Sequence, residues 1–244
     1  MTRLRLDEVL IKRGFYASRA RARDAVLRGT VRVDGALAVK PAQQAAQDCH
    51  IEIADEAQKY VSRGALKLKH ALEHFKVDVT GLNGLDIGAS TGGFTQVLLE
   101  QGTVHVIAID VGHGQFVGWL KSRDRVTSIE GLNSRDLIAE HLTHEIGIIV
   151  CDVSFISLKL ALPSALDLVK PGTVLIALIK PQFEVGRDIV GRSGVVTNPA
   201  EHARVCDGIV AFLEEEGWTV RGVEPSSIEG GDGNKEFLVY AMKR

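Results

Sequence analysis

The chain contains little cysteine, few aromatic residues and no long hydrophobic run. Its 244 residues include three cysteines, Cys49, Cys151 and Cys206, and no two of them are close in sequence. Disulfide frameworks and zinc sites need several cysteines at short spacings, so we expect neither, and no metal centre. No stretch of about 18 apolar residues is present. The opening "MTRLRLDEVLIKRGF" lacks the apolar core of a signal peptide, so we expect a cytoplasmic protein that does not enter a membrane.

Positive charge is concentrated at one end of the chain. The formal net charge is −2, yet residues 1–40 contain ten Lys or Arg and four Asp or Glu, an excess of six that leaves −8 for residues 41–244. A basic segment attached to an acidic body indicates a polyanionic partner. A solvated basic helix would give the same composition, so charge alone leaves both interpretations open.

Residues 1–58 are expected to form a small α+β domain. Two short helices are predicted, "DEVLIKR" capped by Asp7 and "RARARDAVLR" capped by Ser18. The segment "VRVDGALAV" alternates around Asp34 and Gly35, which is a strong hairpin signal, and "CHIEIAD" supplies another strand. A core this small is expected mainly in a domain attached to a larger one.

The second of these helices is rich in arginine and has few acids near it in sequence. Guanidinium groups bind phosphates in bidentate fashion, and the scarcity of aromatics disfavours base stacking, so we expect recognition of RNA by backbone and shape. From Arg3 to about Ala54, the order of these motifs resembles the small RNA-binding domain shared by a small-subunit ribosomal protein, many pseudouridine synthases and tyrosyl-tRNA synthetases. The candidate RNA-binding residues are Arg5, Ser18, Arg19, Arg23, Arg28 and Arg63.

After a linker at residues 59–63, residues 64–244 are expected to form an α/β domain. Apolar runs alternate with helical segments, and "IGIIV" and "VLIALI" are apolar throughout, as in parallel strands covered on both faces. The last two predicted strands are joined by a short loop and are expected to pair antiparallel. We therefore predict a Rossmann-like, mostly parallel seven-stranded sheet with an antiparallel last strand, as in methyltransferases that use S-adenosyl-L-methionine.

A glycine-rich turn follows the first predicted strand of this sheet. Its pattern from Gly88 to Gly93 has Ser90 where a dinucleotide fingerprint has its second glycine. Asp110 ends the next strand, where a carboxylate accepts hydrogen bonds from ribose hydroxyls and repels a 2′-phosphate. Asp86 can hold the turn or face the amino group of a cofactor. The turn alone fits S-adenosyl-L-methionine and a nicotinamide cofactor equally.

The string "D.GASTGGFT" resembles the first motif of the FtsJ-like RNA ribose methyltransferases. "LNSRDL" resembles the adenine-contacting segment of that group and places Asn133 where the family tends to have an acid. An amide also hydrogen-bonds the adenine edge, so we keep this residue. The resemblance implies S-adenosyl-L-methionine as cofactor, with candidate binding residues Asp86, Gly88, Ala89, Ser90, Gly92, Gly93, Phe94, Asp110 and Asn133.

Four charged residues match the Lys-Asp-Lys-Glu set of the ribose methyltransferases in kind and order: Lys67, Asp152, Lys180 and Glu236. Asp152 and Lys180 end the fourth and fifth predicted sheet strands, and Glu236 opens the last. Because the carboxyl ends of parallel strands line the ligand crevice, these side chains are expected to converge, with Lys67 folding over them. Each alone could be a solvated lysine, a helix cap or a surface ion pair.

Rival chemistries of the same fold leave other signatures. Base-amine methyltransferases have prolines after the fourth strand, where this chain has "DVSF". Carbon-5 cytosine enzymes need a cysteine nucleophile, and Cys151 precedes Asp152. Adjacent strand residues point to opposite faces, so both cannot face the substrate. Ribose methylation is the chemistry that fits.

The whole chain resembles the TlyA (hemolysin A-like) family through "YVSRGALKL", "GASTGGFT", "DVGHGQ", "DVSFISL", "IKPQFEVGR" and "GNKEFL", in that order. This resemblance implies an enzyme that methylates the ribose 2′-hydroxyl of cytidines in ribosomal RNA, with ribosomal subunits as partners. The segment "SSIEGGDGN" lacks the proline-rich turn that commonly precedes "GN" in the family. Two alternatives stay open: a membrane-lytic hemolysin, and a non-catalytic RNA-binding factor in ribosome assembly.

Overall fold

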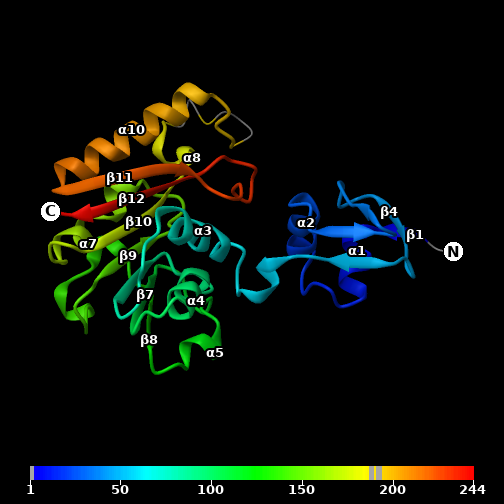
Figure 1. Cartoon of the computed structure of the whole chain (residues 1–244), viewed down its shortest axis with the longest axis horizontal. Coiled ribbons are helices and arrows are strands. Elements are labelled where there is room, and N and C mark those ends of the chain that lie inside the picture. The colour runs from blue at the N-terminus through cyan, green and yellow to red at the C-terminus, as the bar shows by residue number, and fades with distance from the viewer. Residues whose placement is uncertain (1–2, 187–189, 191–193) are drawn as a thin grey trace. The chain divides into compact units, whose positions relative to one another are not determined.

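The computed structural model of this chain describes residues 3–186, 190 and 194–244. The chain divides into two compact units, Met1–Gln58 and Lys59–Arg244 (Figure 1). Among these described residues, the smaller unit has one hydrophobic core cluster and the larger unit has two. The motif "IKPQFEVGR" ends at position 187, which lies outside the described residues.

The described part of the smaller unit, from Arg3 onward, is an α+β fold with two helices and two small antiparallel sheets. The strand β2 pairs with β3 and β5, and β1 pairs with β4. Asp34 and Gly35 turn the β2–β3 hairpin with positive φ angles of 49° and 79°, which confirms the hairpin predicted from this dipeptide. The elements are β1 (Arg3–Arg5), α1 (Leu6–Lys12), α2 (Arg19–Leu27), β2 (Val31–Val33), β3 (Ala36–Leu37), β4 (Gln44–Ala46) and β5 (Ile51–Ile53).

The predicted helix caps of this unit have different outcomes. The Ser18 hydroxyl accepts a hydrogen bond from the backbone N–H of Arg21 at 3.3 Å, so its capping of α2 is confirmed. The cap predicted at Asp7 is wrong, because α1 begins one residue earlier with Arg5 at the cap position. Asp7 is instead fully buried and accepts hydrogen bonds from the guanidinium groups of Arg5 and Arg19.

The larger unit is built on a seven-stranded sheet in the order β11-β12-β10-β9-β6-β7-β8. The strand β12 lies between β10 and β11 and runs antiparallel to both, whereas β10, β9, β6, β7 and β8 pair in parallel. The predicted fold class is therefore confirmed. The strands are β6 (Asn83–Ile87), β7 (His105–Asp110), β8 (Val126–Glu130), β9 (Ile148–Cys151), β10 (Val174–Ile179), β11 (Trp218–Pro225) and β12 (Phe237–Lys243).

Helices cover both faces of this sheet, and α10 runs beside β11 (Figure 1). The helical elements of the unit or at its start are η1 (Glu56–Lys59), α3 (Ala65–Phe75), α4 (Gly93–Glu100), α5 (Gly118–Lys121), η2 (Ser134–Asp136), η3 (Ala139–His141), α6 (Leu158–Ala161), α7 (Pro163–Asp167), α8 (Pro181–Glu184) and α10 (Pro199–Glu215).

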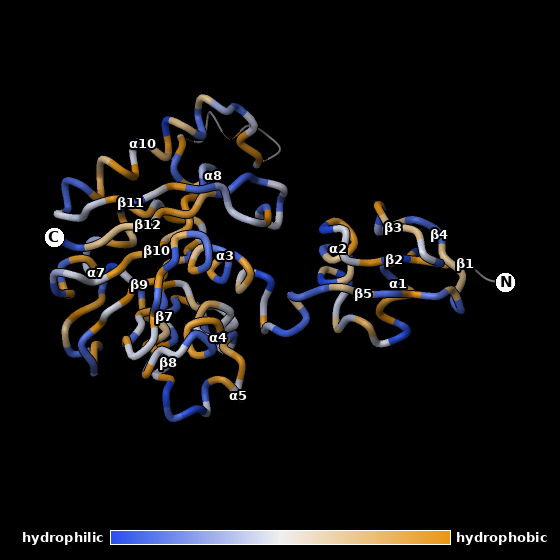
Figure 2. Tube along the Cα trace, in the orientation of Figure 1, coloured by the Kyte–Doolittle hydropathy of each residue, from blue (hydrophilic) through white to orange (hydrophobic). Residues whose placement is uncertain are grey.

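The apolar run of β10 is explained by burial on both sides. Ile176 and Leu178 belong to the hydrophobic cluster of α3 and α4, and Ala177 and Ile179 belong to the cluster of α6, α7 and α10. Figure 2 shows this strand in the colours of hydrophobic residues. A fully buried Ile or Leu contributes about 1.5–3 kcal/mol to stability, so the strand anchors both layers and fixes the position of the residue that follows it.

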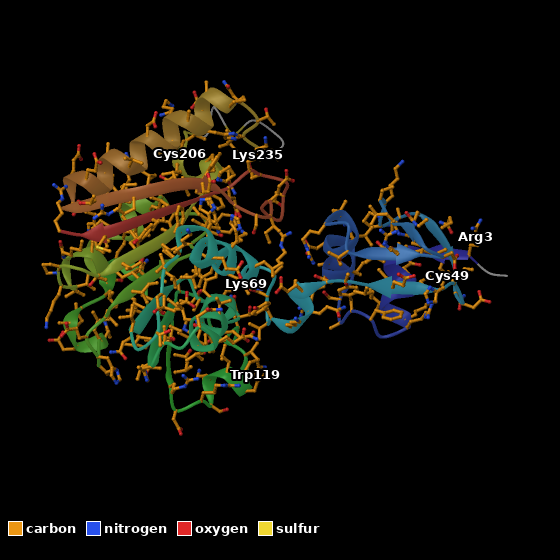
Figure 3. All side chains as sticks on the ribbon, viewed as in Figure 1. Arg3, Cys49, Lys69, Trp119, Cys206 and Lys235 are labelled. Carbon is orange, nitrogen blue, oxygen red and sulfur yellow. The ribbon has the colours of Figure 1, made fainter. Side chains whose placement is uncertain are left out.

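All three cysteines are free. Cys49 and Cys151 are buried, and Cys206 lies on α10 near Lys235 of the β11–β12 loop, as Figure 3 shows. Within the described residues, no helix combines the length and the apolar composition needed to cross a membrane.

Candidate active site

Three strand ends meet at one edge of the sheet. Ile179 of β10 pairs with Phe237 of β12, so Lys180 and Glu236 occupy the next positions of this antiparallel pair. On the other side of β10, Asp152 follows β9 and donates its backbone N–H to Ile87 of β6 at 3.0 Å. The sheet register thus brings the three predicted residues of the strand ends to the same edge.

The four predicted catalytic residues form two ion pairs. The Lys67 ammonium bonds the Glu236 carboxylate, and both side chains are buried, with exposed fractions of 7% and 3%. The Lys180 ammonium lies 2.5 Å from Asp152 Oδ1 and also donates to Ser154 Oγ at 3.0 Å. Each buried ammonium therefore has a carboxylate that compensates its charge, which is the condition for burying it.

The beginning of α3 lies against Asp152. A Cβ placed on Gly64 would be 3.5 Å from Asp152 Oδ2, and the Gly64 carbonyl accepts a hydrogen bond from the backbone N–H of Lys67 at 2.9 Å. The Lys67–Glu236 and Lys180–Asp152 pairs thus belong to one site. Their catalytic role stays a prediction.

A cavity of about 700 Å³ opens beside this site. The predicted cofactor residues that line it are Gly88, Ser90, Asp110 and Asn133, and Asp152 lines it as well. The cavity therefore extends from the glycine-rich turn to the nearer of the two ion pairs.

The glycine-rich turn is set by close backbone contacts. Gly88 has φ 81°, and a Cβ there would lie 2.8 Å from the Asp152 carbonyl oxygen. Ser90 adopts φ 47° and donates its backbone N–H to Asp110 Oδ2 at 2.8 Å. Gly88 is required because any side chain would collide with the backbone of the loop that carries Asp152.

Two polar side chains of the cavity keep hydrogen-bonding positions that no group of the described residues uses. Asp110 accepts from the backbone N–H of Ser90 and from that of Gly112 at 2.7 Å, one on each oxygen, so each oxygen keeps an acceptor site. Asn133 Oδ1 accepts from the backbone N–H and from Nε of Arg135, at 3.1 Å and 3.2 Å. The Asn133 amide therefore offers N–H donors to a ligand, where an acid would offer acceptors.

Five predicted cofactor residues do not line this cavity: Asp86, Ala89, Gly92, Gly93 and Phe94. All five are buried, Asp86 within β6 and the other four in the turn and at the start of α4. Asp86 accepts a hydrogen bond from the Thr95 hydroxyl at 2.6 Å, while its other oxygen has no partner among the described residues. Burial raises the pKa of Asp86 to about 7, and the hydrogen bonds from Thr95 oppose this rise. The geometry fits a residue that holds the turn.

Cys151 is unsuited to nucleophilic catalysis. Its side chain is fully buried in the cluster opposite α3 and α4, as the alternation along the strand indicates. Burial raises the pKa of the thiol to about 12, so the thiolate is not populated near neutral pH. Within the described residues, no group of His, Cys, Asp or Glu has the arrangement of a metal site.

Two residues of this site were missed by sequence reasoning. Ser154 bonds Lys180, and Phe155 lines the cavity with 91% of its surface exposed. Phe155 has φ 65°, and its ring centroid lies 5.0 Å from that of Phe183. The motif "DVSF" contains both residues, but neither the hydrogen bond nor the exposure of an aromatic ring is encoded in a short sequence pattern.

The predicted RNA-binding arginines are more strongly paired than expected. Arg28 lies between Asp24 and Asp55 at 2.7 Å and 2.8 Å, and only 15% of its side chain is exposed. Arg19 shares the buried Asp7 with Arg5. The sequence predicted few acidic partners for these arginines, and this prediction is wrong. Asp7 and Asp55 lie outside the arginine-rich helix, so the local sequence does not reveal the pairing.

The remaining RNA-binding candidates differ in their surroundings. Arg23 and Arg19 are exposed on α2, whereas Ser18 is used as the cap of that helix. Arg63 belongs to the larger unit, where its guanidinium donates to the Glu229 carbonyl at 3.2 Å. Arg23 is thus the plainest candidate for a phosphate contact.

Comparison with known proteins places this geometry in a family. The model of the FtsJ-like methyltransferase family matches residues 60–243. The chain is 41% identical to the 16S/23S rRNA (cytidine-2′-O)-methyltransferase TlyA of Mycobacterium tuberculosis, over 98% of this chain and 89% of that protein. It is 37% identical to hemolysin A of Brachyspira hyodysenteriae, over 97% and 99%.

A solved structure gives the same result. The chain resembles a putative hemolysin from Streptococcus thermophilus with a TM-score of 0.77 and 39% identity, over 100% of this chain and 89% of that one. The matches cover the sheet, the glycine-rich turn and the four charged residues alike. This chain belongs to the FtsJ-like methyltransferase family, within the group that contains TlyA and hemolysin A.

Proposed function

We propose that this chain transfers a methyl group from S-adenosyl-L-methionine to the ribose 2′-hydroxyl of a cytidine in ribosomal RNA. The observation that carries the proposal is the pair of buried Lys–carboxylate ion pairs beside the cavity of the glycine-rich turn. The name of the TlyA relative supplies the nucleotide and the RNA class. Under this proposal the protein binds ribosomal subunits, and it acts in the cytoplasm, where these subunits are found.

The residues of the cavity fit S-adenosyl-L-methionine. Gly88 keeps the wall free of side-chain atoms, Asp110 has acceptor sites left for a ribose diol, and Asn133 has amide donors for an adenine ring nitrogen. When bound, this cofactor supplies a methyl group that its sulfonium already activates. The protein's remaining tasks are to align the accepting oxygen and to assist the loss of its proton.

Lys180 is held in a way that suits proton transfer. A protonated amine has three N–H groups; that of Lys180 donates to Ser154 Oγ and forms an ion pair with Asp152. One position on the nitrogen remains for the ribose hydroxyl, as a donor when protonated and as a lone pair when neutral. Lys67, fixed by Glu236, adds a second positive charge that favours the developing oxyanion.

Two features of the structure suit the binding of RNA. Phe155 presents a largely exposed ring at the cavity, on which the base of the reacting nucleotide can stack. Arg19 and Arg23 of the smaller unit offer guanidinium groups for phosphates.

The proposal is tested with ribosomal subunits from cells that lack this methylation. Purified protein and tritium-labelled S-adenosyl-L-methionine are added, and ribonucleosides from the RNA are identified by mass spectrometry. We expect label in 2′-O-methylcytidine. Label on a base, or no transfer to either subunit, would contradict the proposal.

A second candidate rests on the name of the relative hemolysin A. Lysis of erythrocytes by purified protein, compared between wild type and Lys180→Ala, separates the two functions. Lysis by both proteins would indicate a membrane activity independent of the ion pairs. We expect neither protein to lyse cells.

A further inference from the structure

The loop after β9 and the turn after β10 contact each other at three levels. The loop comprises residues 152–157, between β9 and α6, and the turn comprises Lys180 and the short helix α8. At the first level, Lys180 donates to Ser154 Oγ at 3.0 Å, next to its ion pair with Asp152. This level belongs to the candidate active site itself.

The second and third levels lie farther along both segments. The rings of Phe155 and Phe183 pack with their centroids 5.0 Å apart. Glu184 then accepts a hydrogen bond from the Ser157 hydroxyl at 2.5 Å and another from the backbone N–H of Leu158 at 2.8 Å. These two contacts use one oxygen each, so the Glu184 carboxylate closes the far end of the loop.

The loop between these contacts has a conformation that needs support. Phe155 adopts φ 65°, a left-handed conformation that a bulky L residue takes only at a cost in free energy. Such a conformation persists when the surroundings fix the chain on both sides of it. Lys180 fixes the side of Ser154, and Glu184 fixes the side of Ser157.

Glu184 is not among the described residues that line the cavity. It is partly buried, and burial raises the pKa of its carboxyl group, whereas the hydrogen bonds from Ser157 and Leu158 oppose this rise. Both carboxylate oxygens of Glu184 bond to the end of one loop, so the contacts of this acid serve to hold that loop in place.

We propose that Glu184 is a positioning residue that holds the loop after β9 in the conformation that presents Ser154 to Lys180 and Phe155 to the cavity. This inference rests on the proposed function, because it assigns the loop to the methyl-transfer site. It adds a residue outside the Lys-Asp-Lys-Glu set and outside the cavity wall.

The test compares three variants in methyl transfer to ribosomal subunits at saturating cofactor and RNA. Glu184→Met keeps the side-chain length and removes both acceptors. We expect its kcat to fall about 10- to 100-fold, as for the loss of hydrogen bonds to a charged group. Glu184→Gln keeps an acceptor for Leu158 and a donor for Ser157 Oγ, so it should restore most of the rate. Glu145→Met, at an exposed acid paired with Lys170, is the matched control and should leave kcat unchanged.

A double-mutant cycle distinguishes positioning from general damage. If Glu184 acts through the loop, Glu184→Met and Ser154→Ala remove overlapping contributions, and the double variant loses less than the product of the single losses. Full activity of Glu184→Met, or losses that multiply completely, overturns the inference. If Glu184→Met does not fold, Ser157→Ala removes one of the two hydrogen bonds from the other side, and wild-type kcat in that variant also overturns it.

Hydrogen exchange separates this inference from the proposed function. Amides of residues 153–158 should exchange faster in Glu184→Met than in wild type, and Glu145→Met should match wild type. This measurement needs no RNA and no turnover. Unchanged exchange therefore refutes the positioning role even if the wild-type protein methylates RNA, and faster exchange supports it even if no transfer is seen.

Discussion

Lys180 ends a buried strand, and its ammonium already has two partners at the cavity. Asp152 and Ser154 hold it from the loop after β9, and the lysine follows an apolar run that is packed on both faces of the sheet. The strand explains the position of this nitrogen, and the loop explains its orientation. Ser154 could not be predicted, because its role depends on a hydrogen bond between segments 26 residues apart.

Removal of this amine should abolish most of the methyl transfer. Lys180→Ala is expected to lower kcat by ~10²–10⁴, the usual contribution of a positioned acid–base group. Affinity for S-adenosyl-L-homocysteine, measured by calorimetry, should change little. The matched control is Lys170→Ala, at an exposed lysine paired with Glu145, which should keep wild-type activity. A Lys180→Ala protein with wild-type kcat would refute the role.

Asp86 gives a prediction about stability and pH. Its pKa in the folded protein is about 7, above the ordinary value of 3.8, because the group is fully buried. Between pH 4 and 7 the folded protein then holds a proton that the unfolded chain has lost, so this group makes stability fall as pH rises through that range.

Asp86→Asn removes this titration and can still accept the hydrogen bond from Thr95. The free energy of unfolding of the variant, relative to wild type, should increase from pH 4 to 7 and then level off. Urea unfolding at several pH values measures the difference. A difference that does not change with pH would show that Asp86 is ionised in the folded protein across the range.

Secondary elements were predicted well where burial alone decides them. β7 and β10 have runs of apolar residues that are buried on both sides, and the antiparallel last strand followed from a loop too short for a crossover. β1 and β4 were missed because each has three residues and their pairing joins distant segments. The Asp7 cap was wrong because its carboxylate is taken by two arginines that a local pattern does not reveal.

The turn between β6 and α4 makes a prediction at the scale of an element. Gly88→Ala places a Cβ 2.8 Å from the Asp152 carbonyl oxygen and forces a positive φ on a residue with a side chain. We expect lost affinity for S-adenosyl-L-homocysteine by calorimetry and lower stability. Gly172→Ala has the same kind of backbone, φ 88°, but nothing within 4 Å of its Cβ. This control should lose about 1–2 kcal/mol of stability and no affinity. Equal affinity losses in both variants would refute the close-contact argument.

At the scale of the whole molecule, the chain couples a small basic unit to a methyltransferase unit. The basic N-terminal segment and the alternation of apolar runs with helical segments indicate two different parts of the chain, and the four charged residues are predicted from their match to the Lys-Asp-Lys-Glu set of the ribose methyltransferases. The arginine contacts were harder to predict, because acids from other elements pair with three of the arginines. The smaller unit therefore has fewer free guanidinium groups than its composition indicates.

Arg23 provides the test of RNA binding by the smaller unit. Arg23→Glu should weaken binding to ribosomal RNA and reduce the slope of log K against log salt by about 1. Reversal of Arg19 is a poorer test, because it would also disturb the buried Asp7. Arg204→Glu, an equal charge change on α10 of the larger unit, is the control. If Arg23→Glu and Arg204→Glu weaken RNA binding equally, the effect is a general electrostatic attraction between the protein and RNA, and the smaller unit has no special role in it.

The central claim is that two lysines and two carboxylates gathered at one sheet edge methylate a ribose hydroxyl. The most direct measurement is mass spectrometry of nucleosides from ribosomal RNA after incubation with wild type, Lys170→Ala or Lys180→Ala. The account predicts 2′-O-methylcytidine with the first two proteins and a large loss with the third. A methyl group on a base, or equal methylation by Lys180→Ala, would contradict it.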